Sequence, residues 1–256
     1  GDVTASVTTS GTVDPGAPGD YTITYSVTDS AGNTGTAQRL VHVKKPVDPG
    51  NKVVYLTFDD GPGPYTQQLL DVLAKYNVKA TFFVTNSNSK YQDMIAKEYA
   101  AGHAIGIHTY CHDYNKIYAS EEAYFEDLEA MQDVIVAQTG QETKLVRFPG
   151  GSSNTVSNFN PGIMTTLAQQ LHDKGYEYFD WNVASGDAGE TTSTDQVVEN
   201  VISGIQNYSV SVVLQHDSKD YSVAAVERII QWGQENGYTF LPLRLDSPNA
   251  HHNINN

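Results

Sequence analysis

The chain has 256 residues, 39% of them hydrophobic and 18% charged, a composition typical of a folded globular protein and not of a disordered or fibrous one. This length accommodates a full-sized catalytic domain and a small accessory module, since domains commonly run ~100 to 200 residues. Acidic residues outnumber basic ones by 30 to 15, and the formal net charge of −15 argues against binding to nucleic acid through its phosphates.

The cysteine content and the hydropathy of the chain narrow the possible classes of protein further. Cys111 is the single cysteine, so no disulfide forms within the chain and stability must come from the core or from a metal. No run of about 18 apolar residues predicts a transmembrane segment. The first residues lack the basic start and apolar stretch of a secretory signal, so any export signal would already have been removed.

Residues 1–45 predict a small all-β segment. Residues 21–28 alternate between polar and apolar side chains with period two, which indicates a strand. A turn at 29–33 leads to a second alternating run at 37–43, and the two runs predict a hairpin. An isolated hairpin of this size is only marginally stable.

The segment 46–51 predicts a linker because it holds prolines, a glycine and charge. We expect a catalytic domain over 52–248 and a C-terminal tail over 249–256. Within that domain the predicted strands are 53–58, 80–85, 104–108, 144–148, 176–183, 211–216 and 239–243. The predicted helices are 65–76, 121–138, 163–174, 195–206 and 221–236. This alternation predicts an α/β fold, a distorted (β/α)7-type barrel with a parallel sheet and its chemistry at the carboxyl ends of the strands.

Two candidate motifs follow the first and third of these strands. Asp59 and Asp60 end an apolar strand just before a Gly-Pro turn. Strand neighbours point to opposite faces, so two adjacent carboxylates suit two separate roles, although a solvated Asp-Gly turn is the simpler explanation of the pair alone. His108 and His112 are four residues apart, and two imidazoles with one carboxylate form a common catalytic zinc set. Taken alone, the histidine spacing carries little weight.

Three further motifs also lie at predicted strand ends. Arg147 precedes the Gly150-Gly151 pair, where a guanidinium can orient a carboxylate and glycine N–H groups can approach an oxyanion; a structural salt bridge is the alternative. Trp181 follows Asp180, and the next loop supplies Asp187. His216 ends the run Val212–His216 and is either a core or surface histidine or an acid.

The five motifs, in this order, resemble those of the polysaccharide deacetylases, the NodB-homology family of carbohydrate esterases (family 4). They are TFDDGP at 57–62, HTYCH at 108–112, RFPGGS at 147–152, FDWN at 179–182 with SGD at 185–187, and VVLQHD at 212–217. The resemblance covers about residues 52–243. The N-terminal stretch, GDVT followed by PGDYTITYSVTDSAGNTGTAQRLVHV, resembles the end of a bacterial Ig-like module, which implies that Gly1 lies partway into such a domain.

The family resemblance implies a role for each motif. Asp60, His108 and His112 would bind a divalent metal, usually zinc, with cobalt, manganese or nickel as alternatives. Asp59 would be the general base, which Arg147 would keep charged and aimed. The Gly150 N–H would stabilise the oxyanion. His216 would be the general acid, with Asp187 as its first-choice carboxylate partner and Asp180 as the second.

The chain departs from the family pattern at two places. Asp187-Ala188 stands where an Asp-Trp pair is frequent, and Gly150-Gly151 stands where many relatives have a bulkier Pro-Tyr type sequence. One aromatic wall of the groove is therefore expected to be either absent or replaced by Trp181. The expected substrate-binding residues are Gly150, Gly151, Trp181, Leu214 and Tyr110. Cys111 is expected to be a spectator.

The implied function is metal-dependent removal of N-acetyl groups from N-acetylglucosamine units of peptidoglycan or a chitin-like polymer. The partner would be an acetylated polysaccharide, and we expect a monomer that is secreted or held at a bacterial cell surface. Two alternatives remain: an esterase for O-acetyl xylan that uses the same site, and a non-catalytic glycan-binding protein on an inactive deacetylase fold.

Overall fold

A computed structural model of the chain describes residues 3–14, 19–43, 50–248 and 250–256. The chain divides into two compact units, Gly1–Asp48 and Pro49–Asn256. Residues 46–49 of the predicted linker and the first residue of the predicted tail lie outside the described residues.

The first unit is a three-stranded antiparallel sheet in the order β1-β2-β3, formed by β1 (Thr8–Ser10), β2 (Gly19–Thr28) and β3 (Thr34–Val43), preceded by the 3-10 helix η1 (Thr4–Ser6). The turn between β2 and β3 is held by the Asp29 carboxylate, which accepts hydrogen bonds from the N–H groups of Ala31 and Asn33, both at 2.9 Å. The predicted all-β segment is thus confirmed. β1 was not predicted because three residues are too few to establish a period.

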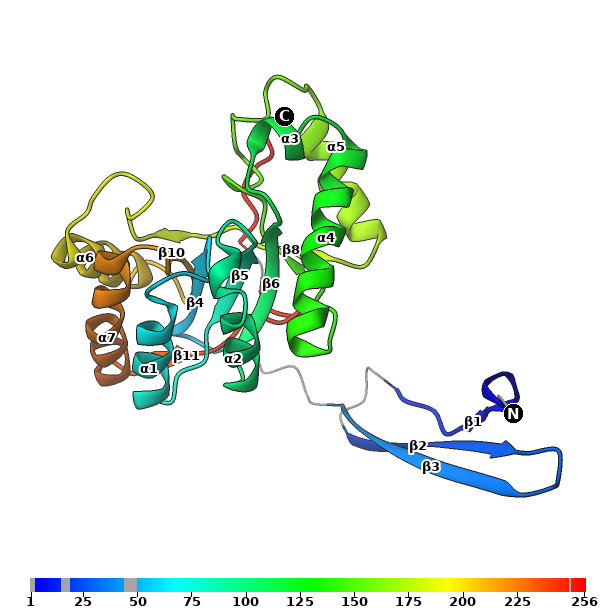
Figure 1. Ribbon diagram of the computed structural model, residues 1–256. Coiled ribbons are helices and arrows are strands. Elements are labelled where there is room, and N and C mark those ends of the chain that lie inside the picture. The colour runs from blue at the N-terminus through cyan, green and yellow to red at the C-terminus, as the bar shows by residue number, and fades with distance from the viewer. Residues whose placement is uncertain (1–2, 15–18, 44–49, 249) are drawn as a thin grey trace. The chain divides into compact units, whose positions relative to one another are not determined.

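The second unit is built around a parallel sheet in the order β8-β7-β6-β5-β4-β10-β9, with β11 paired to the start of β4. Its strands are β4 (Val53–Asp59), β5 (Thr81–Thr85), β6 (Ala104–Thr109), β7 (Leu145–Val146), β8 (Glu177–Tyr178), β9 (Val183–Ala184), β10 (Val210–His216) and β11 (Thr239–Phe240). Its helices are α1 (Thr66–Lys75), η2 (Ser89–Tyr91), α2 (Met94–Ala100), α3 (Tyr114–Ile117), α4 (Glu121–Thr139), α5 (Ile163–Asp173), α6 (Thr194–Ile205) and α7 (Asp220–Glu235). Figure 1 shows these helices around the outside of a curled sheet, as expected for a barrel-type α/β fold.

Side-chain alternation along β4 separates two apolar layers. Val54, Leu56 and Phe58 belong to the large core that the helices cover, whereas Val53 and Tyr55 belong to a smaller cluster with Phe83, Phe179 and Val212. By the period of two, Thr57 and Asp59 lie on the same face of β4 as Val53 and Tyr55. The inner face of the sheet is therefore apolar toward the start of β4 and polar toward its carboxyl end.

The segment 176–183 differs from the single strand that the sequence predicts. It forms β8 at one end of the sheet order and β9 at the other, so residues 179–182 cross from one edge to the other. A chain extends at most ~3.6 Å per residue, and the two edges must therefore approach within ~18 Å. This short crossing nearly closes the barrel, and it carries Asp180 and Trp181.

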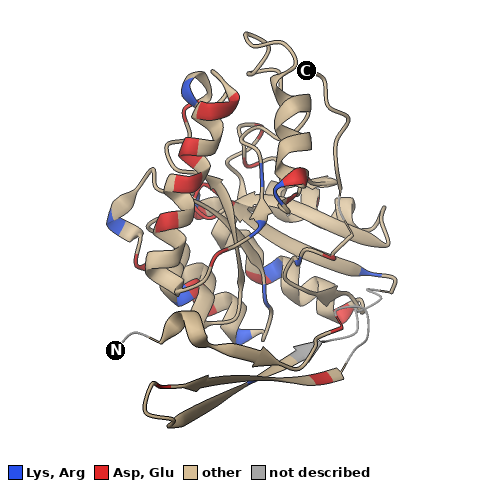
Figure 2. Ribbon diagram, turned by 90° about the vertical axis from the view of Figure 1, so that its right-hand side faces the viewer, with Lys and Arg blue, Asp and Glu red and all other residues tan. Residues whose placement is uncertain are grey.

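Acidic residues are concentrated on α4, whose 19 residues include Glu121, Glu122, Glu126, Asp127, Glu129 and Asp133 and neither Lys nor Arg. Figure 2 shows acidic positions in red distributed over the helices of this unit. A helix with this charge would repel a polyanion. Among the described residues, the structure has no helix with the length and apolar character to cross a bilayer.

Gly204 allows α6 to approach β9, because a Cβ there would lie 2.4 Å from Val183 Cγ1. Alanine is favoured over glycine in a helix by ~1 kcal/mol, but overpacking a core costs ~1–3 kcal/mol. We therefore expect Gly204→Ala to lower the free energy of unfolding, as measured by urea denaturation. A double variant with Val183→Ala should lose less than the sum of the two single changes, and additive losses would contradict the contact.

Candidate active site

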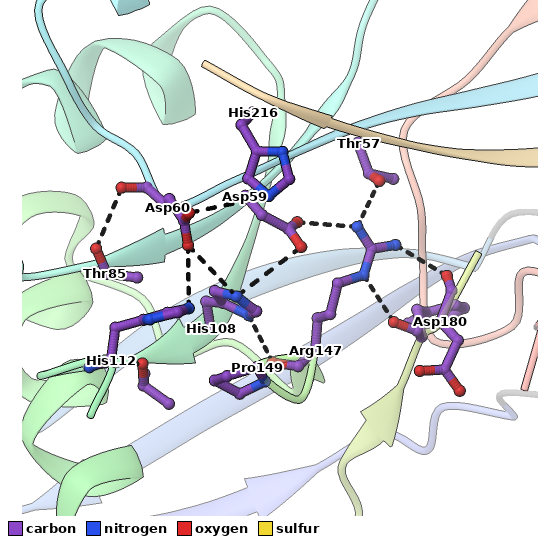
Figure 3. Close-up of polar contacts among 12 residues, drawn as sticks. Thr57, Asp59, Asp60, Thr85, His108, His112, Arg147, Pro149, Asp180 and His216 are labelled. Carbon is purple, nitrogen blue, oxygen red and sulfur yellow. Dashed lines mark hydrogen bonds and ion pairs between the residues drawn. The ribbon is translucent and has the colours of Figure 1, made fainter. Parts of the chain in front are cut away.

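Arg147 follows β7 and is fully buried against the inner face of β4. Its Nη1 lies 2.9 Å from Asp59 Oδ1 and 2.5 Å from Thr57 Oγ1. Nε donates to the carbonyl of Phe179 at 2.8 Å, and Nη2 donates to the carbonyl of Asp180 at 2.9 Å. Figure 3 shows this guanidinium between Asp59 and the crossing segment. The arginine thus fixes one oxygen of Asp59, which is itself 2% exposed.

Asp60 points to a different place from Asp59 because its backbone is left-handed, with φ 69°. Its Oδ1 lies 3.2 Å from His112 Nε2 and 3.6 Å from His108 Nε2. One ligand atom from each of these three residues lies within 4.8 Å of the others. Figure 3 shows the two imidazoles converging on Asp60.

The donor set fits a divalent metal such as zinc. Two ligands at ~2.0–2.1 Å in a tetrahedron lie ~3.3 Å apart, close to the separations of Asp60 Oδ1 from the two imidazoles. Asp60 Oδ1 is also buried with no hydrogen-bond partner among the described residues. His108 Nδ1 lies 2.8 Å from the carbonyl of Arg147 and must donate to it, which leaves the Nε2 lone pair facing Asp60.

Charge within this cluster favours the metal-binding protonation states. Burial opposes ionisation of Asp60, but interaction with the side chains of His108, His216, His112 and Lys219 lowers its pKa below the ordinary value. Burial lowers the pKa of His108 despite the carboxylates beside it. A carboxylate and a neutral imidazole are the forms that bind metal.

His216 at the end of β10 is paired with Asp187, not with Asp180. Its Nδ1 lies 2.8 Å from Asp187 Oδ1, and its backbone N–H donates to Asp187 Oδ2 at 2.8 Å. Burial disfavours the charged ring, but the hydrogen bond and charge of Asp187, with Asp59 and Asp60, raise the pKa of His216 to about 9. This pKa favours the protonated ring at neutral pH, and its Nε2 lies 3.8 Å from Asp60 Oδ2.

Asp180 instead holds the turn that follows Arg147. Its Oδ1 accepts a hydrogen bond from the Ser152 N–H at 2.7 Å, and its Oδ2 accepts from Ser152 Oγ. The same turn presents Gly150, which is exposed with φ 77°. Among the described residues, no hydrogen bond occupies the Gly150 N–H.

These groups surround a cavity of about 330 Å³. Its lining comprises Asp59, Asp60, His108, His112, Tyr114, Gly150, Trp181, Ala188, Leu214, His216 and Lys219. Three of the five predicted substrate-binding residues are among these: Gly150, Trp181 and Leu214. Tyr110 and Gly151 do not line the cavity; Tyr110 is 38% exposed, and a Cβ on Gly151 would lie 3.0 Å from the Trp181 ring. Cys111 does not line it either.

Three lining residues were not among the predicted site residues. Ala188 had been noted only as a departure from the family pattern, and Tyr114 and Lys219 had not been noted at all. The Tyr114 ring lies 5.3 Å from the His112 ring, and Tyr114 could have been suspected from its position two residues after a candidate ligand. Lys219 follows His216 by three residues and gave no comparable signal. Both place new chemistry in the cavity, an aromatic face and a cation.

Comparison with known proteins identifies the class. Residues 47–177 match the family model for polysaccharide deacetylase, and residues 1–43 match that for the Ig-like domain of bacterial surface proteins. The chain belongs to the polysaccharide deacetylase family.

Individual relatives agree with this assignment. A peptidoglycan-N-acetylglucosamine deacetylase of Bacillus cereus is 35% identical over 195 residues, which cover 74% of this chain and 68% of the relative. The crystal structure of the catalytic domain of a peptidoglycan N-acetylglucosamine deacetylase from Eubacterium rectale is 63% identical, with a TM-score of 0.81 over 82% of this chain and 96% of that one. A bifunctional xylanase/deacetylase of Pseudobutyrivibrio xylanivorans is 31% identical over 74% of this chain and 29% of its own length.

The cluster of Asp60, His108 and His112 predicts a metal dependence that direct binding can test. Loss of a residue that hydrogen-bonds to a metal ligand typically lowers metal affinity 10–100-fold. Asp60→Asn changes a ligand itself, so it should lower metal affinity by at least ~100-fold. Competition titration and elemental analysis after dialysis measure this. Asp187→Asn is the matched control, because Asp187 lies outside the cluster and that variant should keep its metal. Retention of metal and activity by Asp60→Ala would overturn the assignment.

Proposed function

We propose that this chain is a metal-dependent hydrolase that removes N-acetyl groups from N-acetylglucosamine units of peptidoglycan. The observation that carries the proposal is that three kinds of group line one cavity. They are a cluster of possible metal ligands, a carboxylate bound to a buried arginine, and a histidine paired with a carboxylate. These are the groups needed to activate water, stabilise an oxyanion and protonate a leaving amine.

Asp59 is the proposed general base. Oδ1 is bound to Arg147 and Oδ2 lies 3.9 Å from His108 Nε2, so Oδ2 is the oxygen that faces the metal cluster. Asp60, His108 and His112 would hold a divalent ion, which would supply Lewis-acid activation of water and of the acetamide carbonyl. Arg147 fixes the orientation of Asp59, and proton transfer to a positioned base requires that geometry.

Two requirements remain, stabilisation of the oxyanion and protonation of the leaving nitrogen. We assign the first to the turn after Arg147 and the second to His216. The N–H of Gly150, which has no hydrogen-bond partner within the described part of the chain, is the proposed donor to the oxyanion, where a rigid backbone donor contributes most. Protonated His216 is the proposed acid for the departing glucosamine nitrogen, because Asp187 binds its Nδ1 and leaves Nε2 facing the cavity. Trp181 and Leu214 would contact the sugar.

Peptidoglycan is the proposed polymer because the relatives in Bacillus cereus and Eubacterium rectale carry that substrate in their names. Chitin-like oligosaccharides present the same acetamido sugar and are the next choice. Zinc is the proposed ion because two imidazoles and one carboxylate are a common zinc set. The match to a surface Ig-like domain favours action outside the cell, at the cell wall.

A second candidate is an esterase that acts on O-acetyl xylan. The relative that combines xylanase and deacetylase activities favours it. The same base and oxyanion donor would serve, but an alkoxide leaving group needs less protonation than an amine. A non-catalytic glycan-binding protein is disfavoured by the intact arrangement of Asp59, Arg147 and His216.

Acetate release tests the function directly. The purified chain should release acetate from peptidoglycan or N-acetylated chito-oligosaccharides faster than from acetylxylan, and a chelator should abolish the activity until metal is restored. Asp59→Asn should lower kcat by ~10²–10⁴-fold, the range of a general base, while it keeps the metal. Preference for acetylxylan would support the esterase, and no release from any of the three would leave the binding protein.

The pairing of His216 with Asp187 predicts the pH dependence of the reaction. A general acid must be protonated, so activity falls as the pH rises through the pKa of His216, which stands at about 9 in the presence of Asp187. Asp187→Asn removes the carboxylate that raises this pKa, and the basic limb of the kcat profile should therefore move to lower pH by about one unit or more. Profiles measured at saturating metal and substrate give this shift. An unmoved basic limb would remove His216 from the role of acid.

A further inference from the structure

Residues 250–256, which we call the C-terminal strap, lie along the turn and loop that follow Arg147. The strap is the red trace that runs to the C-terminus beside α3 and α5 in Figure 1. His252 contacts the start of the loop, and Asn255 Nδ2 donates to the carbonyl of Ser153 at 2.7 Å. Sequence analysis assigned no role to this segment, which contains none of the five motifs.

The imidazole of His252 binds Trp181 through a defined tautomer. Nε2 lies 2.7 Å from the carbonyl of Trp181, so this nitrogen carries the proton. Nδ1 lies 3.1 Å from Ser153 Oγ, within hydrogen-bond distance of that hydroxyl. The two rings of His252 and Trp181 also meet edge to face, with centroids 4.8 Å apart. Trp181, which lines the cavity, is thus held by one residue of the strap that does not line it.

The backbone of His252 is also linked, through Asp180, to the turn that follows Arg147. Its N–H donates to Asp180 Oδ2 at 2.8 Å, on the same carboxylate that binds Ser152. Asp180 is 0% exposed, and its carbonyl accepts from Arg147. Gly151 lies close to both residues, because a Cβ there would be 3.0 Å from the Trp181 ring and 3.2 Å from Asp180 Oδ1.

Asn256 anchors the far end of the strap to the loop and to α5. Its Nδ2 donates to the carbonyls of Ser157 and Asn160 at 2.9 and 3.0 Å, and its Oδ1 accepts from the N–H of Gly162 at 2.7 Å. Its carbonyl accepts from the Thr165 N–H at 2.9 Å. The strap is therefore fastened at both ends of an irregular loop, residues 151–162, that has little regular structure of its own to hold it.

We propose that His252 is a positioning residue for deacetylation. By fixing Trp181 and the turn at 147–152, it sets the width of the substrate cavity and the direction of the Gly150 N–H. The inference deepens the proposed function and rests on it. His252 itself does not line the cavity, so it acts only through Trp181, Asp180 and Ser153.

Three substitutions at His252 separate positioning from simple packing. His252→Ala removes both ring contacts and should lower kcat/KM for an N-acetylated chito-oligosaccharide by about 5- to 10-fold, the size of one or two lost hydrogen bonds. His252→Gln places an amide N–H near the Nε2 position and should recover most of the loss. His252→Asn reaches only toward Ser153 and should resemble His252→Ala.

His251→Ala is the matched control from the adjacent strap residue. His251 stacks on Tyr178 with centroids 3.9 Å apart and lies 2.7 Å from the Tyr178 carbonyl, but it has no contact with Trp181 or the turn. Its kcat/KM should equal that of the wild type. Metal affinity should be unchanged in all four variants, because the ligands lie on β6 and on the loops that follow β4 and β6.

The result that overturns the proposal is an unchanged kcat/KM in His252→Ala, or equal losses in the Ala, Asn and Gln variants. A parallel fall in metal affinity would also overturn it, since that result would indicate general loosening of the site.

A measurement without turnover separates this proposal from the proposed function. The chain has 2 tryptophans, so Trp181 is the sole tryptophan in a Trp232→Phe background. Adding His252→Ala there should increase quenching of Trp181 fluorescence by acrylamide, and adding His252→Gln should not. If the wild type releases no acetate while quenching follows this order, the proposed function fails and the strap still positions Trp181. Unchanged quenching in the Ala variant would refute the claim that the strap positions Trp181.

Discussion

The buried guanidinium of Arg147 is the constraint on which the active-site architecture depends. An uncompensated charge in a protein interior costs several kcal/mol, so a side chain with 0% exposure must have its donors satisfied. Its partners are Thr57 and Asp59 on β4 and the carbonyls of Phe179 and Asp180 on the crossing segment. One cation therefore fixes the proposed base relative to the segment that crosses between the two edges of the sheet. Replacement by lysine would keep the charge but would not supply the planar set of donors that four partners require.

Two adjacent aspartates take different roles because the backbone turns between them. Asp59 ends β4 with its side chain on the inner face, whereas Asp60 adopts φ 69°, a conformation that costs an ordinary L-residue roughly 1–2 kcal/mol. The next residue must be glycine, because a Cβ on Gly61 would lie 2.2 Å from Asp217 Oδ1. Asp217 is fully buried and also accepts a hydrogen bond from Thr66 at the start of α1. Buried Asp217 thus packs against the left-handed turn at Gly61. The turn directs the Asp60 side chain toward His108 and His112.

Much of this arrangement could be predicted because it follows from local pattern. Apolar runs identify strands, parallel strands bring their carboxyl ends to one edge, and so Asp59, His108, Arg147 and His216 had to lie near one another. Asp187 was the first choice and Asp180 the second, and tertiary geometry was needed to decide between them, since Asp180 lies within the predicted strand 176–183 and Asp187 in the loop after it. The crossing at 179–182 was missed because an apolar run does not show which partner each half pairs with. The helix α2 (Met94–Ala100) was missed because seven residues are too few for a reliable period.

The small residues in the cavity explain why contacts outside the motifs matter for this chain. Ala188 lines the cavity where the family resemblance leads one to expect tryptophan, and Gly150 has no side chain at a position that is often bulkier. The aromatic surface that remains comes from Tyr114 and Trp181. Trp181 lies on a crossing segment between two-residue strands, and so regular sheet pairing does little to fix it. Hydrogen bonds from the strap supply the missing restraint, and the shape of the substrate cavity therefore depends on a segment that no catalytic motif includes.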